Sequence, residues 1–240
     1  MIANLLSLDV SPFGRVTVVR PVGTLDLAGY PVLRDELLKL TTEEPAALVV
    51  RLDEEFFAPQ QRMLAVFTTV WLKVSEWPGV PIVIVAETNR HRKALHASAV
   101  DRFVPVHATL SSAVASLARP SPHRVDRVRL PRSPAAPLYA RTFVRDACKR
   151  WRVSLIADDV VVIASELVEN AVQHAESEMV LRLELRPDGL SVAVRDEDPR
   201  PPTRLGLGHG TDLVARLSRT SGWSPAFDGG KVVWAVLAHP

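Results

Sequence analysis

The stretch SELVENAVQHAESE, residues 165–178, determines how the C-terminal half of this chain is interpreted. Glu166, Asn170 and His174 follow one another at intervals of four residues, which is close to one helical turn, so the three polar side chains share one face of a helix. A core stripe has the same spacing: Ile163, Leu167, Ala171 and Ala175. Taken alone, such spacing is more typical of a solvated helix face than of a site. The residues around this helix, which Asp158 is expected to cap, decide between the two interpretations.

The composition is that of an ordinary globular protein. A chain of 240 residues, 47% hydrophobic and 23% charged, favours two domains, each able to bury a core. The net charge of +2 argues against a dedicated nucleic-acid binder. Cys148 is the sole cysteine, which fits a reducing compartment. The first residues lack a basic leader, and no apolar run approaches the roughly 20 residues of a membrane span, so we expect a cytoplasmic protein without a membrane partner.

A break in the hydrophobic pattern divides the chain. The segment ARPSPHRVDRVRLPRSPAAP, residues 118–137, holds five prolines and five arginines. Proline at this density stops helices and favours extended chain, and the alternating HRVDRVRL indicates a strand within the segment. A solvated linker explains the arginines better than a nucleic-acid patch does. We therefore expect one domain over residues 1–118, a linker over 119–134, and a second domain over 124–240 that takes its first strand from the linker.

The two domains differ in their predicted elements. Before the break, strand patterns at residues 16–20, 47–52, 81–87 and 103–106 alternate with helical patterns at 31–40, 60–76, 89–100 and 111–118, which indicates an α/β layer fold. After it, two long helices at 136–151 and 157–175 precede strands at 179–185 and 190–196, a helix at 211–218 and a closing hairpin with the turn FDGG. This order indicates an α+β fold with helices on one face of a mixed, mainly antiparallel sheet.

Three segments of the second domain together resemble the histidine-kinase-like (GHKL) ATPases. Residues 165–178 are similar to the Glu-Leu-x-x-Asn-Ala-x-x-His form of the first family box, found in anti-sigma-factor serine kinases. The strand LSVAVRDEDPRPP resembles the second box and GHGTDLV the glycine box, while GGKVVWAVL resembles the closing hairpin. The boxes occur in family order, over about Arg124 to the C-terminus.

The resemblance implies a cofactor, ATP with Mg²⁺, and a role for each residue. Asn170 would supply an amide oxygen to Mg²⁺, a hard cation that prefers oxygen ligands. Glu166 would take a proton from an attacking hydroxyl, and His174 would support the site. Asp196 would accept a hydrogen bond from the adenine amino group. Gly208 and Gly210 would let the backbone approach the ATP phosphates at the start of a helix. They are the last of the site residues that the resemblance implies.

Some residues depart from the family pattern. Proline and acidic residues follow Asp196 where glycines are common, and the segment between Pro199 and Leu207, where the family has its ATP lid, is short. Thr211 replaces the usual leucine, and Asp212 brings a negative charge to the first turn of the expected phosphate-binding helix.

The first domain resembles the STAS domain of anti-anti-sigma factors. The resemblance rests on GTLDLAGYPVLRDELLKL followed by ALVVRL. Phosphorylatable members carry a serine motif after the central strand, but here the matching stretch is FFAPQQRMLAV, in which Pro59, Gln60, Gln61 and Arg62 replace the motif. Glutamine has no nucleophilic hydroxyl and no charge, so this region is expected to be neither phosphoacceptor nor phosphomimetic. Thr68 and Thr69 come too late in the helix and are expected to pack.

Two classes of function follow. The first is an ATP-dependent serine/threonine kinase of the anti-sigma type with a fused degenerate STAS domain. It would act in partner switching with a sigma factor and a separate anti-anti-sigma protein. The resemblance also implies that it can dimerise through its ATPase domain, as family members commonly do. The second is a non-catalytic partner-binding regulator in which nucleotide binding is weakened or lost. The altered lid and Asp212 favour the second class, whereas Glu166, Asn170 and Asp196 favour the first.

Overall fold

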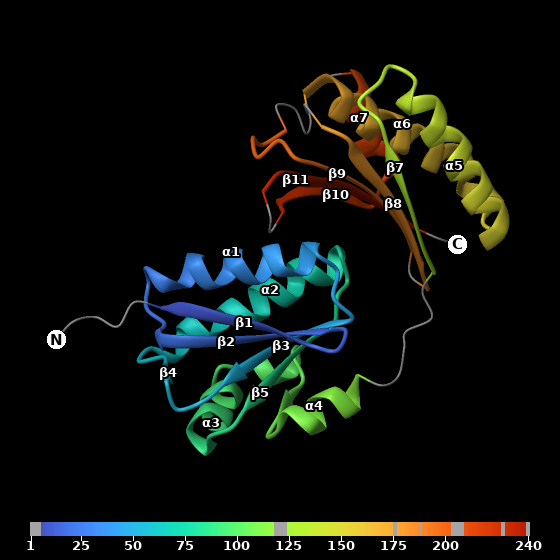
Figure 1. Ribbon diagram of the computed structural model, residues 1–240. Helices are drawn as coiled ribbons and strands as arrows, with labels where there is room; N and C mark the ends of the chain where they lie inside the picture. Colours follow the sequence, from blue (N-terminus) through green and yellow to red (C-terminus); the bar gives the residue numbers. More distant parts are fainter. Residues whose placement is uncertain are drawn as a thin grey trace. The chain divides into compact units, whose positions relative to one another are not determined.

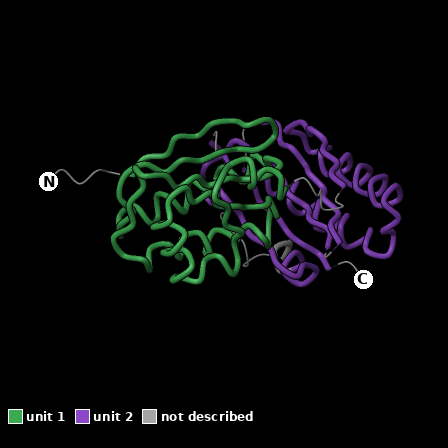
Figure 2. The backbone as a smooth tube through the Cα atoms, turned by 90° about the horizontal axis from the view of Figure 1, so that it is seen from below, with its two compact units in different colours: residues 1–119 green, residues 120–240 purple. Residues whose placement is uncertain are grey.

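The chain forms two compact units, residues 1–119 and 120–240 (Figure 2). A computed structural model describes residues 6–117, 124–174, 177–187, 189–202, 209–226 and 229–238, with backbone alone for 209–212. None of the helices in these ranges is long and apolar enough to span a membrane.

Unit 1 is an α/β layer built on a largely parallel sheet with the strand order β1-β2-β3-β5-β6, and a short strand, β4, pairs with β2 (Figure 1). Only β1 runs antiparallel to its neighbour within this order. The elements are β1 (Ser7–Phe13), β2 (Val16–Thr24), α1 (Gly29–Thr42), β3 (Ala47–Leu52), β4 (Phe56–Phe57), the 3₁₀ turn η1 (Gln61–Leu64), α2 (Ala65–Glu76), β5 (Ile82–Ala86), α3 (Asn89–Ala97), η2 (Val100–Arg102), β6 (Val106–His107) and α4 (Leu110–Ser116).

Both faces of the unit 1 sheet are covered by helices. Apolar residues of α1 and α2 pack on the side of the sheet that bears Val19, Leu48 and Val50. Ala113 of α4 packs on the opposite side, with Val49 among the strand residues that it meets. Burial on both sides explains why β5 is apolar throughout and why β3 is apolar except for Arg51, instead of both strands alternating. The α/β layer predicted for this region is confirmed.

Unit 2 has helices on one face of a five-stranded antiparallel sheet with the order β10-β11-β9-β8-β7 (Figure 1). Its elements are β7 (Arg124–Leu130), α5 (Ala136–Trp151), η3 (Ser154–Ile156), α6 (Ala157–His174), β8 (Met179–Arg186), β9 (Gly189–Asp196), α7 (His209–Leu217), β10 (Thr220–Pro225) and β11 (Lys231–Leu237). The predicted α+β arrangement is confirmed.

The core of unit 2 lies between this sheet and the helices α5, α6 and α7. From α6, the predicted stripe members Ile163, Leu167 and Ala171 are buried there, whereas Ala175 lies outside the described residues. The expectation that Asp158 caps the helix is wrong, because α6 begins at Ala157 and Asp158 belongs to its first turn. In that position its carboxylate still favours the helix, through the positive end of the macrodipole.

Two strands of unit 1 were not predicted from the sequence. β1 pairs with β2 through a two-residue turn, Gly14-Arg15, in which Gly14 has a φ of +62°. Most β1 side chains are exposed, so the strand lacks the buried face that produces a recognisable hydrophobic alternation. The sequence does contain one indication of this hairpin, which is the glycine turn between the two strand segments. β4 is only two residues long and carries no periodicity.

Candidate functional site

Two of the predicted site residues lie one turn apart on α6. The side chains of Glu166 and Asn170 are both half-buried, beside the buried core residues of the same helix. Burial raises the pKa of the Glu166 carboxyl above its ordinary value, and the nearby charge of Glu169 raises it further. A carboxylate with a raised pKa is a stronger proton acceptor. The raised pKa is in the direction that proton abstraction needs, and the general-base role of Glu166 stays a prediction.

His174 lies at the last position of α6, and its side chain is exposed. Its backbone carbonyl accepts a hydrogen bond from Arg200 Nη2 at 3.4 Å. Arg200 belongs to the loop that follows β9, so this contact joins the end of the first box to the second box. The contact uses the main chain of residue 174, and the expectation that its imidazole supports a site stays a prediction.

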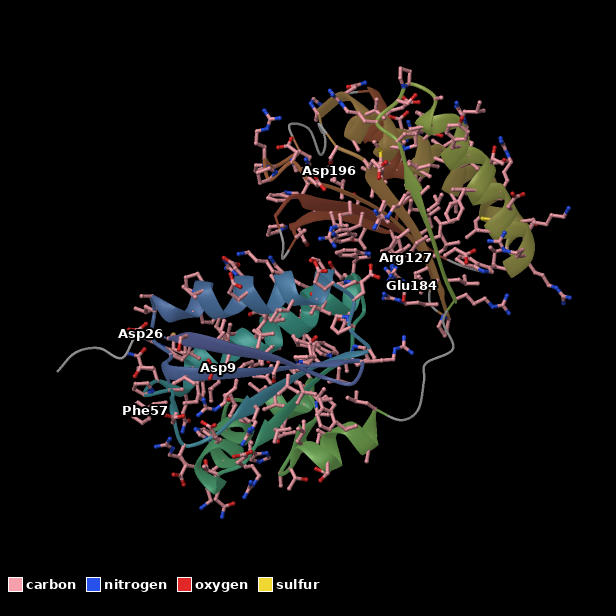
Figure 3. All side chains as sticks on the ribbon, viewed as in Figure 1. Asp9, Asp26, Phe57, Arg127, Glu184 and Asp196 are labelled. Atoms are coloured by element: carbon pink, nitrogen blue, oxygen red, sulfur yellow. The ribbon has the colours of Figure 1, made fainter. Side chains whose placement is uncertain are left out.

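Asp196, the last residue of β9, lies at the end of its strand (Figure 3). It is buried, with only 3% of its surface exposed. It lies on the same strand face as Val192 and Val194, which belong to the core beneath the helices. Its Oδ1 atom accepts hydrogen bonds from Lys231 Nζ at 3.0 Å and from the backbone N–H of Asp198 at 2.9 Å. A buried carboxylate needs such partners because desolvation of an unpaired charge is costly. Within the described part of the chain, no residue donates a hydrogen bond to the second oxygen, Oδ2.

Lys231, the first residue of β11, is a partner of this carboxylate that the sequence interpretation missed. It is 4% exposed, and besides Asp196 it donates a hydrogen bond to the backbone carbonyl of Asp198 at 3.1 Å, with Asp198 Oδ2 at 3.5 Å. Arg200 Nε also contacts Asp198, at 2.8 Å. The hydrogen bond from Arg200, aided by the charge of Lys231, holds the pKa of the Asp198 carboxyl far below its ordinary value. Two carboxylates and two cations thus form one charge-balanced cluster.

Gly230 explains how Lys231 reaches Asp196. It has a φ of +74°, a conformation that favours glycine, and a Cβ atom at this position would lie 2.1 Å from the backbone oxygen of Asp196. The turn therefore brings the two strands into close contact, and the register of β11 against β9 pairs Lys231 directly with Asp196. The glycines in FDGG were expected to supply positive φ, and Gly229 and Gly230 both do.

The predicted glycine box is described only in part. Gly210 belongs to the backbone of α7, close to its N-terminus, as do Thr211 and Asp212, whose side chains are not described. Gly208 lies outside the described residues, as does most of the segment expected to form the lid. The phosphate-binding role of Gly208 and Gly210 and the effect of Asp212 remain predictions.

In unit 1, residues 59–62 replace the phosphorylation motif of the resembled family. They follow β4 and run into η1. Gln60, Gln61 and Arg62 are exposed, and Arg62 donates hydrogen bonds to the side-chain oxygen of Gln60. Thr69 lies within α2, where its hydroxyl forms a 3.0 Å hydrogen bond with the hydroxyl of Tyr30 from α1. Thr68 is half-buried on the same helix.

Comparisons with known proteins agree with the architecture of unit 2. Residues 130–223 match the family model of the histidine kinase-like ATPase domain, whereas no curated protein matches the chain. The matched segment runs from the end of β7 through α5, α6, β8, β9 and α7 into β10, so it includes Glu166, Asn170 and Asp196.

Solved structures show weaker similarity. An anti-sigma factor antagonist from Mycobacterium paratuberculosis is 22% identical, with a TM-score of 0.42 over 48% of this chain and 95% of that one. The RsbU and RsbW domains of a Mycobacterium tuberculosis protein are 20% identical, with a TM-score of 0.39 over 48% of this chain and 32% of that one. The anti-sigma factor antagonist SpoIIAA is 15% identical, with a TM-score of 0.37 over 47% of this chain and 96% of that one. The family match, together with the observed sheet and helices, shows that the chain contains a histidine kinase-like ATPase domain over residues 130–223.

Proposed function

We propose that the protein is an ATP-binding serine/threonine protein kinase of the anti-sigma type, with a fused STAS-like regulatory unit, that acts in partner switching. One observation carries the proposal. Within the matched ATPase domain, α6 presents Glu166 and Asn170 on successive turns, and β9 ends in the buried carboxylate of Asp196. These groups supply the proton acceptor, the hard oxygen ligand and the base-reading acceptor that such a kinase needs.

The donor groups present fit a magnesium-bound nucleotide. Asn170 is half-buried and offers a neutral amide oxygen, which suits a cation that also keeps waters and phosphate oxygens as ligands. Asp196 keeps Oδ2 free of hydrogen bonds from the described residues, so this atom can accept one from an exocyclic amino group. When bound, ATP supplies the phosphoryl group. Glu166 would hold the proton released by the substrate hydroxyl, and Gly208 and Gly210 would approach the phosphates with their backbone.

Unit 1 supports a regulatory role for the same chain. The exposed residues Gln60, Gln61 and Arg62 leave no hydroxyl at the start of the second helix, and Thr69 is engaged with Tyr30. The phosphoacceptor is then a serine or threonine of another protein, for which a separate anti-anti-sigma protein is the proposed substrate. A sigma factor is the proposed competing partner, and the ATPase domain is the proposed dimerisation surface.

A second candidate is a non-catalytic regulator that binds partners through the same fold with weak nucleotide affinity. Asp212 favours it, since α7 carries this acid in its first turn, where a negative charge opposes phosphate binding.

A phosphotransfer assay distinguishes the two candidates. The full chain is incubated with radiolabelled ATP, Mg²⁺ and each STAS-domain protein of the same organism that retains a serine at the start of its second helix. We expect transfer to one such serine, and a decrease of about 100-fold or more in Glu166→Gln, which removes the proton acceptor but keeps its shape. The matched control is Asp159→Asn, since Asp159 is an exposed acid on the same helix. If ATP binds but no partner is labelled, the chain is the non-catalytic regulator.

A further inference from the structure

Lys231 occupies a position that calls for an explanation. A lysine that is 4% exposed is rare, because its ammonium must be compensated inside the protein. Here Nζ donates two hydrogen bonds, to Asp196 Oδ1 at 3.0 Å and to the Asp198 carbonyl at 3.1 Å, and it forms an ion pair with Asp198 Oδ2 at 3.5 Å. The ammonium charge is therefore compensated by the carboxylates of Asp196 and Asp198.

The two oxygens of the Asp196 carboxylate differ in the hydrogen bonds that they accept. Oδ1 accepts from both Lys231 Nζ and the Asp198 backbone N–H, whereas Oδ2 receives no hydrogen bond from any residue in the described part of the chain. Two hydrogen bonds to one oxygen fix the rotation of the carboxylate. They also leave the other oxygen as an acceptor only, since an ionised carboxylate has no proton to donate.

We propose that Lys231 is a positioning residue that determines base specificity at the site, by orienting Asp196 so that Oδ2 accepts a hydrogen bond from an amino group of the base. This inference rests on the proposed ATP-binding function. Because Lys231 is only 4% exposed and its Nζ is held between Asp196 and Asp198, it is not placed to donate to a carbonyl oxygen of the base. The site therefore accepts the 6-amino group of adenine and rejects the 6-oxo group of hypoxanthine, whose oxygen would face Oδ2 as a second acceptor.

The test is calorimetric titration of the full chain with ATP and with ITP, each with Mg²⁺. These nucleotides differ at position 6 of the purine and in the proton on N1 that accompanies the 6-oxo form. Wild-type protein should bind ATP between about 10-fold and 100-fold more tightly than ITP, the range expected for one hydrogen bond to a charged group. Lys231→Met should lower the affinity for ATP by about the wild-type ratio, between about 10-fold and 100-fold, and change that for ITP little, so that the preference for ATP disappears.

Lys149→Met is the matched control, because Lys149 is exposed on α5 of the same unit and should leave both affinities unchanged. A purely structural role for Lys231 would lower both affinities together and overturn the proposal, as would Lys231→Met protein that keeps the preference for ATP. If Lys231→Met does not fold, the ratio of the wild-type affinities for ATP and ITP still tests the proposal. Equal binding of the two nucleotides by wild-type protein would contradict it. Absence of binding by either nucleotide would overturn the proposed function itself, which is a different result from binding without discrimination.

Discussion

At the scale of single residues, the two units accommodate buried ionisable groups in different ways. Lys231 is charged and compensated by carboxylates, whereas His91 of α3 is kept neutral. His91 is 5% exposed, its Nδ1 pairs with the hydroxyl of Thr88 at 2.8 Å, and its Nε2 pairs with the backbone carbonyl of Phe56 in β4 at 3.0 Å. Burial lowers the pKa of His91 below its ordinary value, although the bond to Phe56 acts in the opposite direction.

This lowered pKa predicts how the stability of unit 1 depends on pH. The unfolded chain protonates His91 at a higher pH than the folded chain does, so its contribution is complete above about pH 6.5 and decreases as pH falls toward the folded pKa. Hydrogen-exchange opening energies, corrected for intrinsic rates, should decrease in unit 1 between pH 7.5 and 5.5. The decrease should be smaller in His91→Gln and unchanged in His107→Gln, in which the replaced ring pairs with the neutral hydroxyl of Ser116. Equal decreases in wild type and His91→Gln would contradict this assignment.

At the scale of elements, the turn before β11 controls the geometry around Asp196. Gly229→Ala and Gly230→Ala both place a side chain at positive φ, at a cost of about 1 kcal/mol each. Only at position 230 would the new Cβ also collide with the backbone of Asp196, because nothing lies within 4 Å of a Cβ at 229. Gly230→Ala should therefore lower both the melting temperature and the ATP affinity more than Gly229→Ala. Equal effects of the two substitutions would show that the close approach does not matter.

The same elements show what the sequence could predict and what it could not. The long helices and the central strands were predictable, because α6 buries a regular stripe and β3 a continuous apolar run. β1 was not, because its side chains are mostly exposed. Lys231 was not either, since a lysine at the start of a strand is ordinary in sequence. Its significance comes from the register that pairs it with Asp196, 35 residues away, and that register is a property of the folded sheet.

At the scale of the whole molecule, the chain combines an ATPase domain with a second unit that has its own core and no hydroxyl at Gln60 or Gln61. Under the proposed function, the chain phosphorylates another protein if its site binds ATP, and only captures one if it does not. The proposal that the site binds ATP with Mg²⁺ is therefore central to the account.

Calorimetric titration with ATP and Mg²⁺ tests that proposal most directly, with three proteins: wild type, Asn170→Ala and Gln173→Ala. Asn170 is half-buried on α6, and Gln173 is an exposed amide on the same helix, so the two substitutions differ in the proposed magnesium contact. We predict one ATP per chain for wild type and Gln173→Ala, and at least about a 10-fold loss of affinity for Asn170→Ala. No binding by wild type, or equal binding by wild type and Asn170→Ala, would contradict the account.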